Sequence, residues 1–274
     1  MLIRSRRLFS LLIIGFALLA GQRNAGAQTG TMVASIASGL PGATVTVVVS
    51  MTSSTNADGF SFGISHAASQ LTPLGILPGA ALNPAFGGIA ADVFLIQLTP
   101  PGGAGVTVGC LIDLGPPPFQ TLPAGPTHAV VNLQYVIAAT ATPGSKTLSF
   151  TESLGSPPVE VLLVCGGIPV DPVTTNGSII VQAVTLRRGD CHLDGSLNLT
   201  DAVVCLRRLF GISPPGNCAD AQDIDDNGLL NIADATFLLQ YLFAGGPLIP
   251  APFGSCGVDP TPDSLGCSSP PACL

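Results

Sequence analysis

Two acid-rich stretches of similar sequence lie 33 residues apart in the last third of the chain. They read DCHLDGSLNLTDAVVCLRRLFG from Asp190 and DIDDNGLLNIADATFLLQYLFAG from Asp223. In each, oxygen-bearing side chains stand mostly at positions 1, 3, 5, 9 and 12, and a glycine stands at position 6. An EF-hand-type loop surrounds calcium with this spacing, because the ion takes about six to eight oxygens and a tight turn directs alternate side chains inward. The repeat therefore predicts two calcium-binding loops.

The sequence changes to a helical period directly after each loop. The apolar residues of the two predicted helices are Leu199, Ala202, Val203, Leu206, Leu209 and Phe210, and then Ile232, Ala235, Leu239, Leu242 and Phe243. A glycine and a proline follow each helix and end it. We expect the two apolar stripes to pack on each other, so that metal binding and folding are coupled. The alternative is a pair of acidic, solvated turns that bind no metal.

Residues 28–186 show a different pattern, in which apolar and small polar residues alternate. In TVTVVVSM, the side chains of Val45, Val47, Val49 and Met51 share one face, and the same alternation recurs in HAVVNLQYVIA, KTLSFT and GFSFGISH. Gly and Pro clusters such as TPPGGAG and LGPPPF separate these runs. The sequence therefore predicts an all-β antiparallel sandwich of jelly-roll type, followed by a small all-α module.

The first 27 residues have the pattern of a secretory signal peptide. Three arginines precede an apolar run from Leu8 to Ala20, and a small-residue cleavage site ends at Ala27. The apolar run is too short to span a bilayer comfortably, and no later stretch reaches about 20 apolar residues. We expect cleavage near Ala27 and a secreted protein, extracellular or at the cell surface, with no membrane span.

Cleavage would remove four of the nine basic residues and none of the sixteen acids, so the charge balance would become 5 minus 16, or −11. Phosphate backbones and anionic lipids repel such a chain, which argues against nucleic acid or membrane surfaces as partners. Export also exposes the eight cysteines to an oxidising compartment, so we expect disulfides. We predict the pairs Cys110–Cys165 and Cys191–Cys205, and leave open the pairing of Cys218, Cys256, Cys267 and Cys273.

The segment GFSFG at residues 59–63 matches G-x-S-x-G, the nucleophile elbow of α/β-hydrolases. That elbow needs a strand that turns into a helix, whereas Ser61 lies in an alternating strand pattern with no helical pattern after it. We interpret the match as a coincidence. Glu152 and Glu160 are the only glutamates, and nothing in the sequence supports them as a glycosidase pair. We therefore expect a protein that is not an enzyme, with a glycoside hydrolase as the least favoured alternative.

The region from Arg188 to about Gly246 resembles a dockerin type I module, a duplicated calcium loop and helix, through its motifs DxxxDGxLNLTDA and DxDDNGLLNIADA. The resemblance implies calcium-binding side chains at Asp190, Asp194, Asn198 and Asp201 in the first loop and at Asp223, Asp225, Asn227, Asn231 and Asp234 in the second. Ser196 and Leu229, at position 7, would each add a main-chain carbonyl. His192 stands at position 3, where imidazole is a poor ligand for calcium, so we expect the first site to be the weaker one.

Dockerins bind cohesins, and the resemblance places the residues that contact the partner at loop positions 10 and 11, which are Leu199, Thr200, Ile232 and Ala233. The alternative for Leu199 and Ile232 is a place in the core. Residues 28–186 are similar to cohesin-like or carbohydrate-binding β-sandwiches of bacterial secreted proteins, through LPGATVTVVV and GFSFGI. The chain has no Trp and two Tyr, which weakens the carbohydrate-binding reading because sugars stack on such rings.

These observations predict a sandwich over residues 28–186, a dockerin-like calcium module over 187–246, and a Pro-, Gly- and Cys-rich tail over 247–274 that caps the module. The expected function is calcium-dependent assembly with a protein that carries a cohesin-like sandwich, a second copy of this chain being one such protein. The alternative is a polysaccharide-binding accessory protein of a polysaccharide-degrading system.

Overall fold

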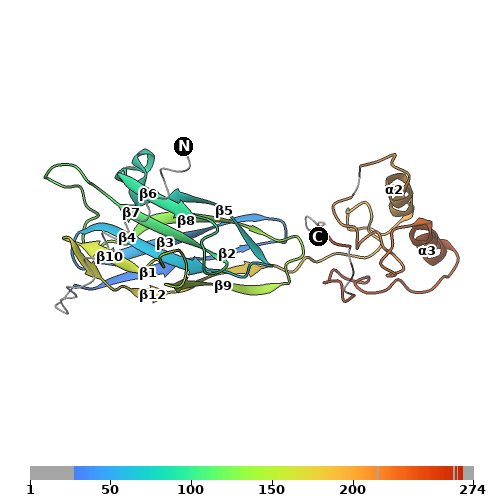
Figure 1. Ribbon diagram of the computed structural model, residues 1–274. Coiled ribbons are helices and arrows are strands. Elements are labelled where there is room, and N and C mark those ends of the chain that lie inside the picture. The colour runs from blue at the N-terminus through green and yellow to red at the C-terminus, as the bar shows by residue number, and fades with distance from the viewer. Residues whose placement is uncertain (1–27, 215, 262, 264, 268–274) are drawn as a thin grey trace. The chain divides into compact units, whose positions relative to one another are not determined.

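The structure is a computed structural model that describes residues 28–214, 216–261, 263 and 265–267 (Figure 1). The predicted signal peptide and Cys273 lie outside the described residues. The chain divides into two compact units. The first, here called the sandwich unit, holds the residues up to Gly39 and from Ala43 to Val181. The second, here called the helical unit, holds Leu40–Gly42 and the residues from Gln182 onward.

The sandwich unit consists of two β-sheets (Figure 1). The strands of the five-stranded sheet, in spatial order, are β12 (Val173–Thr175), β1 (Gly30–Ala34), β3 (Thr44–Ser53), β8 (His128–Ile137) and β5 (Leu71–Pro78). The eight-stranded sheet runs β11 (Ile168–Val170), β10 (Leu162–Cys165), β4 (Ala57–Ser65), β9 (Gly144–Thr151), β13 (Gly177–Val181) and β2 (Ile36–Gly39), with β7 (Gly105–Leu111) paired to β4 and β6 (Val93–Gln97) to β7. Two 3-10 turns, η1 (Ala80–Leu82) and η2 (Pro84–Phe86), follow β5.

The alternating residues form the core between the sheets, as the sequence predicts. In β3, Val45, Val47, Val49 and Met51 are all buried, while the residues between them are partly or fully exposed. The same face-by-face division holds along β8. Successive side chains of a strand point to opposite sides, so one face of each sheet can be apolar throughout. The sandwich architecture is therefore confirmed.

Two strand pairs depart from the predicted antiparallel arrangement. β1 pairs with β12 in parallel, and β2 pairs with β13 in parallel. The stretch from Gly30 to Gly39 changes from one sheet to the other at Ser35, whose hydroxyl accepts a hydrogen bond from the Val48 N–H at 2.9 Å. The stretch from Val173 to Val181 makes the same change beside it. The first and last strands of this unit thus run side by side in the same direction, a pairing that no local sequence pattern specifies.

The predicted disulfide between Cys110 and Cys165 is wrong, since both thiols are free and buried. Phe60 of β4 pairs with Cys110 of β7 on one side and with Leu163 of β10 on the other. Cys165 pairs with Ala57, three residues from Phe60 along β4, so the two cysteine Cα atoms lie further apart than two strand spacings, which is about 10 Å. A disulfide needs a Cα–Cα distance below about 7 Å. Burial raises the pKa of the Cys110 thiol to about 12 and raises that of Cys165 as well.

The described residues of the helical unit form two α-helices, α2 (Leu199–Leu209) and α3 (Ile232–Phe243), connected and flanked by loops (Figure 1). A disulfide joins Cys191 to Cys205, the pairing expected from the sequence, and a second joins Cys218 to Cys267. Its core is small and includes Ala202, Ile224, Ala235, Leu238 and Ile249. Within the described residues, no helix combines the length and the apolar character that a membrane span requires.

The predicted apolar stripes of the two helices are only partly buried. Ala202 and Cys205 are buried on α2, and Ala235 and Leu238 on α3. The residues predicted for the stripe that remain exposed are Leu199, Val203, Leu209, Phe210, Ile232 and Phe243. The buried face also carries the first-turn carboxylate of each helix and, on α2, the disulfide cysteine, while Leu206, Leu239 and Leu242 of the predicted stripes pack against the core partly buried. A helical period shows that one face is apolar but not how much of that face is covered.

Candidate metal centre

The two acid-rich loops, Asp190–Asp201 and Asp223–Asp234, adopt nearly the same backbone conformation. At position 4, Leu193 and Asp226 have φ of 62° and 60°, values that non-glycine residues rarely adopt. At position 6, Gly195 and Gly228 have φ of 79° and 77°, where the absence of a Cβ removes the steric penalty. The duplicated sequence thus yields a duplicated turn.

The aspartate at position 1 organises each turn from inside. Its carboxylate accepts hydrogen bonds from the backbone N–H groups of positions 5 and 6. For Asp190 the two distances are 3.2 and 2.9 Å, and for Asp223 they are 3.2 and 2.8 Å. Both side chains are almost fully buried. A buried carboxylate with its backbone donors fixed in this way keeps the loop closed around it.

The aspartate at position 12 closes the loop and caps the helix that follows. Asp201 accepts from the N–H groups of Asn198 and His192, both at 2.9 Å, and Asp234 accepts from those of Asn231 and Ile224, both at 2.8 Å. The asparagine at position 9 caps the helix in return, by accepting from the N–H at position 11 at 2.8 Å in both loops. These are capping boxes at the starts of α2 and α3.

Burial raises the pKa of both position-12 carboxyls, and the neighbouring acids raise it further. Asp190 and Asp194 act on Asp201, and Asp225 and Asp223 act on Asp234. Each loop therefore gathers negative charge where water is scarce, which favours either a proton or a cation there.

The second loop brings three of its predicted ligands together. Carboxylate oxygens of Asp223, Asp225 and Asp234 all lie within 4.8 Å of one another. One oxygen of Asp225, Oδ1, is buried and has no hydrogen-bond partner among the described residues. An unpaired buried carboxylate oxygen beside two further carboxylates matches the needs of a hard divalent cation. The residues of this loop therefore fit calcium.

The first loop is arranged less favourably for a cation. His192 Nδ1 lies 3.1 Å from Oδ2 of Asp194, and both side chains are about half exposed. The ring therefore occupies one oxygen that the ion would need. The Ser196 N–H donates to the other oxygen at 2.8 Å, and this bond, followed by the one to His192, lowers the pKa of Asp194. Among the described residues, the close groups of three acidic side chains involve only the second loop and the residues around it.

Arg188 lies at the centre of the helical unit, and sequence reasoning missed its role. Its side chain is fully buried. The guanidinium donates to three main-chain carbonyls and pairs with two carboxylates. The carbonyls are those of Ala251, Asp220 and Asp223, at 3.2, 3.2 and 2.6 Å, and the carboxylates are those of Asp226 and Asp259, at 2.9 and 2.8 Å. The only signal in the sequence was an Arg-Arg pair directly before the first loop in a chain poor in basic residues.

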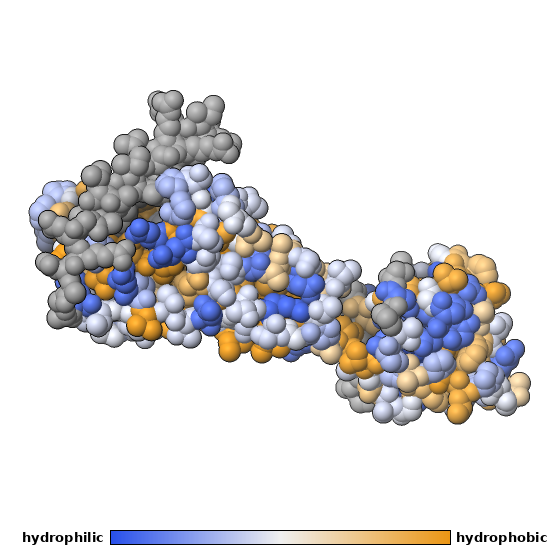
Figure 2. Space-filling model, turned by 60° about the horizontal axis from the view of Figure 1, so that its bottom comes forward, coloured by the Kyte–Doolittle hydropathy of each residue, from blue (hydrophilic) through white to orange (hydrophobic). Residues whose placement is uncertain are grey.

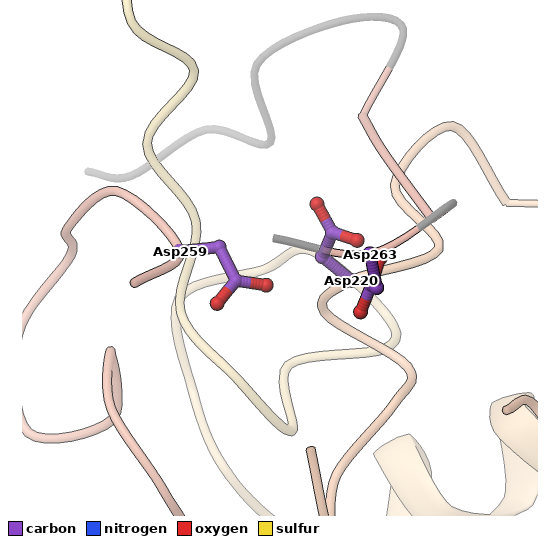
Figure 3. A group of neighbouring side chains, drawn as sticks. All are labelled: Asp220, Asp259 and Asp263. Atoms are coloured by element: carbon purple, nitrogen blue, oxygen red, sulfur yellow. The ribbon is translucent and has the colours of Figure 1, made fainter. Parts of the chain in front are cut away.

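A further acidic group that the sequence did not predict lies next to the second loop (Figure 3). Figure 3 shows the carboxylate of Asp259 directed toward Asp220 and Asp263, and oxygens of the three lie within 4.8 Å of one another. Burial, and then the charges of Asp259 and Asp263, raise the pKa of Asp220 to about 6. Asp263 also lies in a second group with Asp223 and Asp226. The C-terminal segment thus adds acids to the side of the second loop.

Of the four residues predicted to contact a partner, Leu199, Thr200 and Ile232 are exposed, and Ala233 is half-buried. Leu199 is 52% exposed and Ile232 is 55% exposed, so neither has a place in the core. Leu229 is exposed as well. Figure 2 shows apolar side chains on the surface of the helical unit next to its polar surface.

The hydrolase-like serine belongs to a continuous strand, as the sequence analysis interprets it. Ser61 lies inside β4, and its hydroxyl donates to the Glu160 carbonyl at 2.7 Å. His128 Nε2 lies 2.8 Å from the Pro123 carbonyl. In the described part of the chain, the hydrogen bonds of both side chains go to main-chain carbonyls and not to a second catalytic group.

A scan against protein-family models found no matching family, and a search of curated proteins found no match. Among solved structures, the chain is similar to a cohesin from Clostridium acetobutylicum, with a TM-score of 0.44 and 21% identity over 56% of this chain and 91% of that one. It is also similar to the seventh ScaB type I cohesin from Pseudobacteroides cellulosolvens, with a TM-score of 0.45 and 15% identity over 57% and 94% of the two chains. A non-cellulosomal cohesin from Archaeoglobus fulgidus scores 0.38 at 18% identity, over 57% and 92%. The likeness to these cohesins is one of β-sandwich architecture.

Proposed function

We propose that this chain is a secreted, non-catalytic assembly protein whose helical unit is a dockerin-like module that binds two calcium ions and docks to a β-sandwich. The observation that carries the proposal is the pair of loops in register. They share five of the six hydrogen bonds in which a side chain accepts from a backbone N–H, positive φ at positions 4 and 6, and a helix that begins at the same offset.

Calcium is the ion that best suits these loops, because the ligands expected from their spacing are carboxylates, amide oxygens and main-chain carbonyls. Zinc and copper prefer imidazole or thiolate ligands. The thiols of Cys191, Cys205, Cys218 and Cys267 are not available to them, because they form two disulfides. If a loop bound calcium at about 1 μM in about 1 mM extracellular calcium, occupancy would stabilise the unit by about 4 kcal/mol.

The exposed apolar residues at the starts of the helices supply the docking face. Leu199 and Ile232 both stand at loop position 10, where the helices begin, and are more than half exposed. Large apolar side chains exposed on a small unit suit a protein partner better than a sugar or a phosphate. Because the loops fix where both helices begin, calcium would set the spacing of Leu199 and Ile232.

The partner proposed here is the sandwich unit of a second copy. The chain carries both a sandwich and the proposed module, and contact between the module of one molecule and the sandwich of the next would build chains that do not close. Light scattering of the chain from Gln28 onward, at high protein concentration, tests this. The mass should rise with calcium and fall back with a chelator, and a double variant, Leu199→Asp with Ile232→Asp, should stay monomeric in calcium. A wild-type monomer under both conditions would reject the second copy as partner.

Calorimetric titration with calcium tests the loops directly. We expect two sites of unequal affinity, with the weaker one lost in Asp190→Ala and the stronger one in Asp223→Ala. His192→Asn should strengthen the weaker site, because it frees the Asp194 oxygen and restores an amide oxygen at position 3. Absence of any binding heat, together with an unchanged circular dichroism spectrum, would refute calcium binding.

A further inference from the structure

Two consecutive arginines, Arg187 and Arg188, each contact a different loop of the helical unit. Arg187 Nη1 donates to the carbonyl of Gly195, at position 6 of the first loop, at 2.7 Å. Arg188 Nη1 donates to the carbonyl of Asp223, at position 1 of the second loop, at 2.6 Å. Arg188 Nη2 also pairs with the carboxylate of Asp226, at position 4, at 2.9 Å.

Residues 251–259 hold both arginines from the other side. Arg187 Nε donates to the Phe253 carbonyl at 3.1 Å. The Arg188 N–H donates to the Pro252 carbonyl at 2.6 Å, and its Nη2 pairs with Asp259 at 2.8 Å. The backbones of Leu186 and Gly257 exchange two hydrogen bonds at 2.8 and 3.0 Å. The arginines are therefore fixed to an element that belongs to neither loop.

The arginine pair is not part of the duplicated motif. The residues 33 positions after Arg187 and Arg188 are Asp220 and Ala221. One pair thus serves both loops, and it serves them unequally. The second loop is held at two positions by a fully buried guanidinium, and the first loop at one carbonyl by a side chain that is less buried.

A buried cation beside a proposed calcium site is unfavourable on charge alone, because it repels the ion. The buried Arg188 can favour binding in another way, through the conformation that it imposes on the second loop. The main chain at positions 1 and 4 of the second loop must stay in place for Asp223 and Asp225 to face the ion, and Asp226 adopts a strained backbone conformation there. A planar fork of donors, whose Nη2 pairs with Asp259 as well as with Asp226, can hold that conformation, whereas a single flexible ammonium cannot.

We infer that Arg188 is a positioning residue of the second loop, with Asp259 as its counter-ion from outside the loop sequence, and that it holds the loop in its metal-binding shape before the ion arrives. The inference rests on the proposed function, since the shape matters for binding only if the loop takes calcium. A preformed loop loses less entropy when it binds, so the second site gains affinity that its ligand set alone would not provide.

Calcium titration of the chain from Gln28 onward, with disulfides intact, separates shape from charge. Asp190→Ala isolates the second site, and Asp223→Ala isolates the first. In the Asp190→Ala background, Arg188→Lys keeps the charge but loses the fork, and we expect its affinity to fall about tenfold, as for other residues that orient metal ligands. Arg188→Met should also weaken the second site, whereas charge alone predicts tighter binding because a repelling cation is gone. In the Asp223→Ala background, neither change should alter the first site.

Arg207→Lys and Arg207→Met, on the exposed side of α2, are the matched controls and should leave both affinities unchanged. If Arg188→Met does not fold, as shown by its circular dichroism, Arg188→Lys decides alone. Unchanged affinity in Arg188→Lys, or tighter binding in a folded Arg188→Met, would overturn the positioning role while calcium binding stands. Absence of calcium binding in the unsubstituted chain would instead remove the proposed function and the positioning role with it.

Discussion

Leu238→Ala should make folding of the helical unit depend on calcium. Leu238 lies on α3 and is fully buried in a core of few residues. Replacing a buried leucine by alanine costs about 3 to 5 kcal/mol, because transfer energy is lost and a cavity remains. A unit of this size has little stability to lose. Calcium at about a thousand times its dissociation constant returns about 4 kcal/mol. Loss and gain are similar in size, so the variant should be largely unfolded without the ion and folded with it.

The assay is urea denaturation followed by circular dichroism at 222 nm, with calcium or with chelator, because both α-helices among the described residues belong to the helical unit. In the unsubstituted chain both conditions should give a cooperative helix transition. In Leu238→Ala, only the sample with calcium should give a cooperative helix transition. Leu209→Ala, at a more exposed position of α2, is the matched control and should shift the transition by less than about 0.5 kcal/mol. Equal destabilisation of Leu238→Ala with and without calcium, with no recovery of helix, would refute the coupling.

Three further predictions follow from buried polar groups and thiols. In the native protein, N-ethylmaleimide should leave Cys110 and Cys165 unmodified, because both thiols are buried. In urea without reductant it should label both and spare the disulfide-bonded Cys191 and Cys205, as peptide mass spectrometry would show. If Cys110 and Cys165 stay unlabelled in urea, the predicted disulfide between them is correct after all. Asp220→Asn should raise the unfolding free energy of the calcium-free helical unit at pH 7 by about 1 kcal/mol after allowance for solvent screening. The folded-state pKa of Asp220, about 6, lies above its unfolded value, so ionisation of this carboxyl lowers the free energy of unfolding as pH rises from about 4 to about 6. Urea unfolding across that pH range should show this fall in the unsubstituted chain and not in Asp220→Asn. Tyr135→Phe should leave the stability of the sandwich unit unchanged or raise it by about 1 kcal/mol, because the buried Tyr135 hydroxyl has no partner among the described residues. Urea unfolding measures this change. A loss of stability above about 1 kcal/mol would show that a water bonds the hydroxyl, for example one shared with Nδ1 of the adjacent His66.

The sandwich was predictable because strand faces are encoded locally. The alternation that buries Val47 and Val49 appears within eight residues of sequence. The pairing of strands is not local, and two features were missed for that reason. The parallel pairs depend on which strands meet at the sheet edges, and the free thiols depend on β4 lying between β7 and β10.

The loops were predictable because ligand spacing is encoded within about a dozen residues. The structure places Asp223, Asp225 and Asp234 together, as the spacing requires. The contributions from outside the loops were not predictable in this way. Asp259 and Asp263 lie in a Pro-rich segment with no motif, and Arg188 becomes important only where the chain brings residues 251–259 back to it.

The helical unit buries carboxylates beside its apolar core and exposes apolar side chains where its helices begin. Asp190, Asp201, Asp223 and Asp234 are buried to within 3% of full burial, while Leu199 and Ile232 are more than half exposed. Both features are unfavourable by themselves, because buried carboxylates repel one another and exposed apolar side chains contribute no hydrophobic stabilisation. Calcium would compensate the first and a docked β-sandwich the second. If the partner docks only on helices whose starts are fixed by loaded loops, then chelation should abolish docking in the unsubstituted chain, and Leu199→Asp with Ile232→Asp should abolish docking while both calcium sites keep their affinities.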